Sequence, residues 1–119
     1  KKAEAEGIYL HGDFIHTIMP DKDEDAFDYI MQSIKLGFVR AITFYADMLY
    51  NGYGTKVDKE KAISEYKKAA DKGDYTAMVK YYSFKKKEGK VYFERALKSE
   101  NAEAMLIHAC QLEKELNKL

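Results

Sequence analysis

Apolar residues recur at helical spacing along most of the chain, between short polar or glycine-rich breaks. In Ala41–Leu49 they lie three or four positions apart, which predicts one buried helix face. Gly52–Gly54 predicts the end of this helix, since two nearby glycines supply left-handed turn conformations. Asp58 stands where a following helix needs an N-cap, and the apolar stripe within Ala62–Gly73 predicts that helix. Such a short linker predicts an antiparallel helix pair.

This helix pair has imperfect copies on both sides. Ala62–Gly73 aligns with Ala26–Gly37, and both ends of the two segments give the same offset of 36 residues. A further first helix is predicted from Ala102. A fixed period between about 20 and 50 residues is typical of a solenoid, whose units bury their apolar faces only against neighbours. We therefore predict an all-α fold of stacked helix pairs.

The period breaks in two places. Aligning Tyr9–Gly12 with Leu49–Gly52 gives an offset of 40 residues, four more than 36, so we predict a long acidic linker over Asp13–Asp25. In the third copy Lys85–Lys90 replaces the glycine turn, and the second helix follows nine residues early. Either that helix is shortened or its linker is tightened. We expect the lysine segment to be a solvated, mobile turn.

Composition limits the function classes. The chain has 119 residues, with 20 basic and 20 acidic side chains, so nothing attracts nucleic acid over a long range. Cys110 is the only cysteine, which excludes an intrachain disulfide and favours a reducing compartment such as the cytoplasm. No apolar run reaches the length of a membrane span. The chain begins at Lys1 without a methionine, so we expect a segment of a longer protein.

The segment Ala41–Gly73 resembles the Sel-one-like repeat (SLR), a relative of the tetratricopeptide repeat. The positions that match its pattern are Ala41, Gly52, Gly54, Asp58, Lys61, Ala62, Tyr66, Ala69, Ala70 and Gly73. The resemblance implies a right-handed α/α superhelix of about three and a half repeats, forming one solenoid domain over residues 1–119. We place the repeats at about 1–37, 38–73, 74–100 and 101–119.

The resemblance also implies a concave face lined by the first helix of each repeat, and a scaffold or adaptor that binds a peptide or protein there. The partner-binding candidates are Arg40, Thr43, Phe44, Asp47, Tyr50, Asn51, Lys80, Ser83 and Lys87. Further positions on this face would be Leu10, His11, Val79, Lys86, Ile107 and Cys110. Aromatic residues beside Arg and Lys favour a partner that carries acidic groups. Packing between helices is an equally good reading of Phe44 and Tyr50.

Two other functions remain open. The first is a non-catalytic spacer, or end-to-end self-association through apolar end faces. The second is binding or hydrolysis of a small ligand such as a β-lactam, as the resemblance to cysteine-rich relatives implies. Those relatives carry a disulfide in each repeat, whereas this chain has one cysteine. We expect no enzyme activity and no cofactor.

No metal site is expected either. Asp21, Asp23 and Asp25 alternate like the start of a calcium loop, but the glycine and the glutamate that such a loop needs are missing further on. We expect Asp23 or Glu24 to cap the second helix instead. His11, Asp13 and His16 would lie on the irregular linker, too loosely spaced for a metal centre. Their expected role is that of exposed loop residues.

Overall fold

The computed structural model describes residues 2–119, which form seven α-helices and one short 3₁₀ helix, without a strand. In chain order these are α1 (Lys2–Ile18), η1 (Pro20–Lys22), α2 (Asp23–Lys35), α3 (Val39–Asn51), α4 (Lys59–Asp71), α5 (Tyr75–Phe84), α6 (Lys86–Lys98) and α7 (Ala102–Asn117). The prediction of an all-α fold is confirmed.

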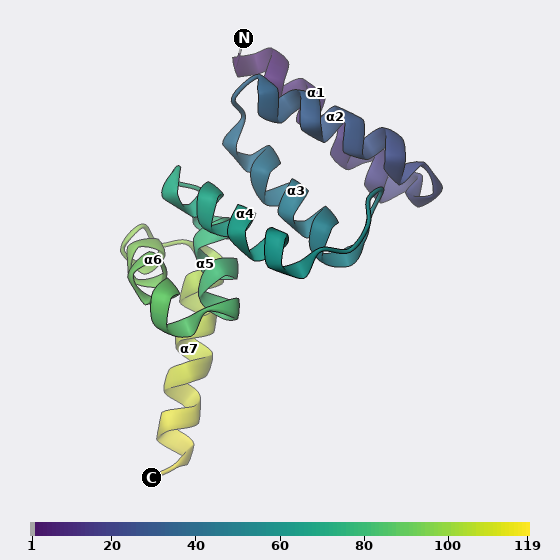
Figure 1. Cartoon of the computed structure of the whole chain (residues 1–119). Helices are drawn as coiled ribbons and strands as arrows, with labels where there is room; N and C mark the ends of the chain where they lie inside the picture. The colour runs from purple at the N-terminus through teal and green to yellow at the C-terminus, as the bar shows by residue number, and fades with distance from the viewer. Residues whose placement is uncertain (1) are drawn as a thin grey trace.

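The helices stack as three pairs followed by one unpaired helix. α1 packs on α2, α3 on α4 and α5 on α6, and each pair contacts the next (Figure 1). The radius of gyration is 15.6 Å, whereas a compact domain of this length has about 13.5 Å. The described part of the chain is therefore an elongated solenoid, with α7 projecting from one end. None of its helices combines the length and apolar composition needed to cross a membrane.

Small side chains set the close spacing of the helices. Ten alanines are almost fully buried, and large side chains such as Ile30, Met48 and Met78 fill the layers between them. A buried alanine lets two helix axes approach, so that dispersion contacts form along the whole interface. The buried alanines are Ala5, Ala26, Ala41, Ala46, Ala62, Ala69, Ala70, Ala77, Ala96 and Ala104.

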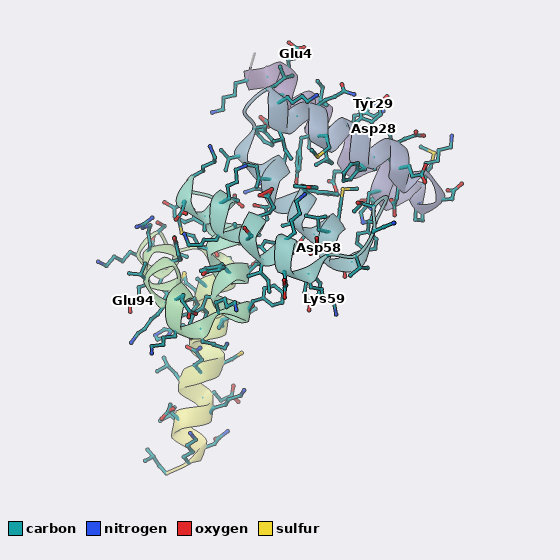
Figure 2. The ribbon with its side chains drawn as sticks, in the orientation of Figure 1. Glu4, Asp28, Tyr29, Asp58, Lys59 and Glu94 are labelled. Atoms are coloured by element: carbon teal, nitrogen blue, oxygen red, sulfur yellow. The ribbon has the colours of Figure 1, made fainter. Side chains whose placement is uncertain are left out.

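The turn of the second pair forms as the sequence predicts. Gly52 and Gly54 adopt positive φ angles of 78° and 69°. Asp58 caps α4, because its Oδ1 accepts a hydrogen bond of 3.1 Å from the backbone N–H of Lys61 (Figure 2). A Cβ atom on Gly54 would lie 2.2 Å from the carbonyl oxygen of Asp23. The turn of this pair therefore rests directly on the start of α2.

The prediction of a long linker in the first repeat is wrong. α1 continues through Gly12 to Ile18, and only residues 19–22 separate it from α2. Gly12 is buried in the middle of α1, where an added Cβ would lie 3.0 Å from Cδ1 of Ile30. The better equivalence pairs Ala5 with Ala41, both buried and 36 residues apart. The first repeat keeps the period of 36 residues, because residues predicted to form the linker belong to a longer first helix.

The lysine segment is also not a turn. α5 ends at Phe84 and α6 begins at Lys86, so Lys85 is the whole linker and the following lysines form the first turns of α6. Of the two alternatives, the tightened linker is correct, since α6 has 13 residues like α4. α5 has 10 residues where α3 has 13. The shorter first helix and the shorter linker together account for the missing residues.

Gly89 makes this tight junction possible. It is buried against the neighbouring helix, and a Cβ there would lie 2.5 Å from the Cα of Tyr82. Since the opposing atom belongs to the backbone of α5, no side-chain movement could relieve that contact.

Neither Asp23 nor Glu24 caps α2, contrary to prediction. The N-cap position is Lys22, which makes no side-chain capping bond, and both acids lie in the first helical turn. Asp23 instead accepts a hydrogen bond of 2.8 Å from Nδ1 of His16. The acidic first turn still interacts favourably with the positive end of the helix dipole.

The turns inside the three pairs follow one another along an edge that we call the turn edge. Gly54 touches the start of α2, and the ring of Tyr50 lies 5.0 Å from that of Phe84, next to Lys85. Acidic residues over 21–25 begin this edge and lysines over 85–90 end it. Opposite charges are therefore separated along the solenoid.

Candidate functional site

The first helices of the pairs form one continuous surface. Tyr9 of α1 meets Phe38, which precedes α3, with ring centroids 5.1 Å apart. It also meets Phe44 of α3 edge-on, at 5.8 Å. Offset and edge-on contacts are the favourable geometries for aromatic rings. These three rings join α1 to α3 and form the floor of a groove, which we call the first-helix groove.

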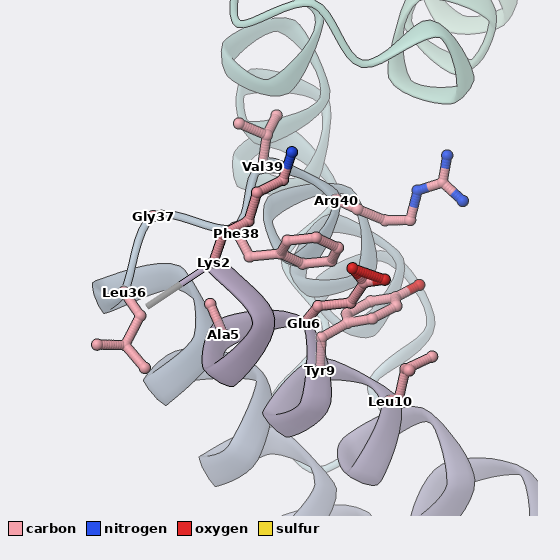
Figure 3. A pocket seen from close by; sticks show the side chains of 10 residues that line it. All are labelled: Lys2, Ala5, Glu6, Tyr9, Leu10, Leu36, Gly37, Phe38, Val39 and Arg40. Atoms are coloured by element: carbon pink, nitrogen blue, oxygen red, sulfur yellow. The ribbon is translucent and has the colours of Figure 1, made fainter.

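A hollow of about 700 Å³ opens at the N-terminal end of the first-helix groove (Figure 3). Its lining is apolar over most of the floor, with the charged side chains Lys2, Glu6 and Arg40 beside it. The apolar and backbone contributions come from Ala5, Tyr9, Leu10, Leu36, Gly37, Phe38 and Val39. Concave apolar surface with a few polar groups is the usual composition of a binding site.

A second, smaller hollow of about 110 Å³ continues towards α5. Tyr9 and Arg40 line both hollows, so the two adjoin along the groove. Burial raises the pKa of the Tyr9 phenol, and the negative charge of Asp13 raises it further. The phenol therefore stays neutral at physiological pH and keeps its hydrogen-bond donor.

Asp74 fixes the junction between α3 and α5 beside this smaller hollow. Its Oδ2 accepts a hydrogen bond of 2.5 Å from the Thr43 hydroxyl and one of 3.2 Å from the backbone N–H of Ala77. It is therefore the N-cap of α5 and a contact to the preceding repeat at once. Its Oδ1 lies 3.9 Å from Nε of Arg40.

Asp47 makes a second junction further along the groove. Its Oδ1 accepts hydrogen bonds from the Tyr66 hydroxyl of α4 and, at 2.7 Å, from Nζ of Lys80 of α5. Burial raises the pKa of the Tyr66 phenol well above its usual range, and the hydrogen bond to Asp47 adds to this rise. One carboxylate thus connects three helices of two repeats.

A solved structure has the same arrangement of helices. The crystal structure of a Sel1 repeat protein from Oxalobacter formigenes matches 87% of this chain with a TM-score of 0.70 and 20% sequence identity. The chain has the SLR fold. It spans 46% of the length of that SLR protein. At the level of sequence, no family model and no curated protein matches the chain.

The first-helix groove contains several of the predicted binding residues, and most of them contact side chains of a neighbouring repeat. Thr43 is buried and bonded to Asp74, while Asp47 and Lys80 are bonded to one another. Phe44 packs against Tyr9. These side chains hold neighbouring repeats together, and Arg40 is the predicted basic residue that remains mostly exposed on this surface.

The other predicted positions lie towards the edge of the SLR stack. Tyr50 packs on Phe84, and Asn51 donates a hydrogen bond of 2.9 Å to the backbone carbonyl of Asp47. Ser83 is exposed near the end of α5. Lys87 does not lie on a first helix as predicted, because the shortened α5 places it on α6.

The two histidines of the first SLR repeat lie on α1 rather than on an irregular linker. The ring of His11 contacts that of Tyr29 of α2 in a tilted arrangement, with centroids 4.4 Å apart. His16 contacts Tyr53 at 4.5 Å in addition to its bond with Asp23. Within residues 2–119, no three His, Cys, Asp or Glu side chains gather as metal ligands would.

Three groove residues escaped the sequence analysis: Tyr9, Phe38 and Asp74. Asp74 follows Gly73 and caps the N-terminus of α5. Asn101 takes the equivalent position before α7 and caps that helix in the same way. The recurrence of a capping residue at this position could have identified Asp74 as an N-cap from the sequence. Tyr9 and Phe38 gave none, because their contact depends on how α1 packs against α3.

Proposed function

We propose that this chain is a non-catalytic interaction scaffold that binds a segment of another protein in the first-helix groove. The observation that supports this most is the hollow of about 700 Å³, which is already formed and has an apolar floor. Preformed apolar concavities bind side chains with little loss of conformational entropy. Solenoids typically use such inner surfaces for binding.

The lining favours a large apolar side chain from the partner. Tyr9, Leu10 and Val39 surround the hollow with carbon surface, and Leu10 is largely exposed there. Covering these groups removes apolar area from water, which contributes about 25 cal/mol per Å². A partner residue such as leucine or phenylalanine fits this chemistry.

A carboxylate next to that side chain would meet Arg40. The side chain of Arg40 is 59% exposed, and 3.9 Å from its Nε to Asp74 is too long for a hydrogen bond. Its guanidinium donors are therefore free for a planar, bidentate acceptor. Lys2 adds a second positive charge and Glu6 a negative one. Preference for an acidic partner thus depends on Arg40 and Lys2, because Lys80 is already paired with Asp47.

The test is a selection of binding peptides from a displayed library on the immobilised chain. The affinities of the selected peptides are then measured by fluorescence polarisation. Leu10→Asp and Arg40→Glu change two exposed side chains of the hollow, and each should weaken binding by about tenfold or more. Val57→Asp is the matched control, since Val57 is also exposed but lies in the α3–α4 turn.

Peptides that bind both groove variants as tightly as the wild type would show that the groove is not the site. Weaker binding to Leu10→Asp alone would retain the apolar pocket and reject the role of Arg40.

A further inference from the structure

α7 carries an apolar seam that nothing covers in the described part of the chain. Its members alternate at spacings of three and four residues, the heptad spacing of a coiled coil. They are Ala102, Met105, Ala109, Leu112 and Leu116, with Leu119 just beyond the helix. All six are exposed. We call this row the α7 seam.

The solenoid holds α7 by a different side. Ala104 is buried, Ile107 is half-buried, and Nε2 of Gln111 donates a hydrogen bond of 3.0 Å to the hydroxyl of Tyr82. With 100° of rotation per residue, this side lies about two fifths of a turn from the seam. The seam is therefore free along its length, and the C-terminal half of α7 projects beyond the other helices (Figure 1).

The preceding repeats show that this helix face normally has a neighbour. The fourth residue after the N-cap is Ile42 in α3, Met78 in α5 and Met105 in α7. Its exposed fraction is 6% in α3, 1% in α5 and 48% in α7. The same position is thus apolar in all three helices and uncovered in one.

We propose that the α7 seam binds the α7 seam of a second copy of this chain, with the two helices antiparallel. In the register that overlaps the whole seam, Ala109 faces Leu112 of the second copy, and Met105 faces Leu116. Ala102 then faces Leu119. A small residue meets a large one in two of these three layers, so the two helices interdigitate.

The flanking polar residues fit the same register. His108 of one copy lies beside Glu115 of the other, and this pairing occurs twice because of the two-fold symmetry. No two acidic side chains face each other across the seam in this arrangement. Antiparallel helices also place opposite ends of their dipoles together.

A parallel pair fits less well. It would place Ala102 against Ala102 and Ala109 against Ala109, so that narrow alanine layers would adjoin wide layers formed by methionine and leucine. It would also bring both solenoids to the same end of the coiled coil. The antiparallel pair places them at opposite ends, where the projecting half of α7 leaves room.

The experiment measures the mass of the 119-residue chain by sedimentation over a range of concentrations. Since the seam is short, we expect a dimer that dissociates at micromolar rather than nanomolar concentration. Leu112→Lys should raise the dissociation constant more than about tenfold, because the lysine would be buried at the centre of the seam. Ile18→Lys, an exposed isoleucine at the end of α1, is the matched control and should leave the dimer unchanged.

Cross-linking tests the register. With Cys110→Ser as background, the double variant Met105→Cys with Leu116→Cys should form a disulfide-linked dimer, and neither single variant should. A cross-link through Leu116→Cys alone would indicate a parallel pair and overturn the antiparallel geometry. A chain that stays monomeric at about 1 mM, or a dimer that Leu112→Lys leaves intact, would overturn the proposal. The result is independent of whether the first-helix groove binds a peptide.

Discussion

Replacing Asp47 by alanine should loosen the junction between the second and third helix pairs. Asp47 accepts hydrogen bonds from Tyr66 and Lys80, which belong to α4 and α5. The alanine removes both acceptors without adding bulk. Tyr66 is only 3% exposed, so its hydroxyl would lose its partner in a place that water reaches poorly.

The cost follows from the burial of the two donors. A buried hydroxyl without a partner costs about 1–3 kcal/mol. The Lys80 ammonium is about one third exposed and can turn to water, so it adds no more than roughly 0.5 kcal/mol. We expect Asp47→Ala to lower the free energy of unfolding by about 2 kcal/mol, which corresponds to a fall in Tm of roughly 6–12 °C.

The chain contains a matched control for this change. Asp71 also accepts hydrogen bonds from a tyrosine and a lysine, Tyr92 and Lys67, but its side chain is half exposed. Asp71→Ala should therefore cost less than about 1 kcal/mol. Urea unfolding followed by circular dichroism measures both variants.

A double-mutant cycle with Tyr66→Phe then isolates the contact between Asp47 and Tyr66, with an expected coupling of about 1 kcal/mol. The reasoning is refuted if Asp47→Ala and Asp71→Ala cost the same, or if the two changes at Asp47 and Tyr66 are additive.

Three further results are expected. Gly89→Ala should lower the urea midpoint by the equivalent of about 1–3 kcal/mol, because its Cβ meets the backbone of Tyr82; an unchanged midpoint would contradict the close approach of α5 and α6. Because the pKa of Tyr66 is raised in the folded state, this residue should contribute its full stabilisation below pH 10. That contribution should fall as the pH rises above 10, since the tyrosine of the unfolded chain loses its proton first. Tyr66→Phe should reduce this alkaline loss in unfolding curves at pH 8–11, and a variant that loses stability as steeply as the wild type would contradict the role of Tyr66. Asp58→Ala removes the cap of α4 and should lower the Tm by the equivalent of about 1 kcal/mol, whereas Asp58→Asn should restore most of it.

The central helix pair could be predicted from sequence because its signals are local. Gly52, Gly54 and Asp58 each act through their own backbone or the next turn, and no distant contact is needed to interpret them. The first repeat was harder to predict, since Gly12 alone does not show whether a helix ends at the glycine or packs closely against a neighbour there. Its neighbour is Ile30, 18 positions away in the sequence, and only that contact explains the glycine.

The candidate site was predicted in part for a similar reason. Arg40 and Phe44 were placed correctly on a first helix by the period of the repeat. Lys87 was assigned to the wrong helix because α5 is shorter than the first helix of the other repeats. The spacing of the repeats showed that residues were missing, but not which helix or linker lacked them. The contact of Tyr9 with Phe38 depends on the packing of two helices, so no local pattern indicates it.

The turn edge gives this chain an electrical asymmetry that its net charge conceals. Acidic residues over 21–25 and lysines over 85–90 lie at different ends of the same edge, while the total charge is zero. Such a separation gives the turn edge a local dipole, and a dipole aligns in a field even when the molecule has no net charge. The chain should therefore approach an anionic surface lysine end first and a cationic one acid end first.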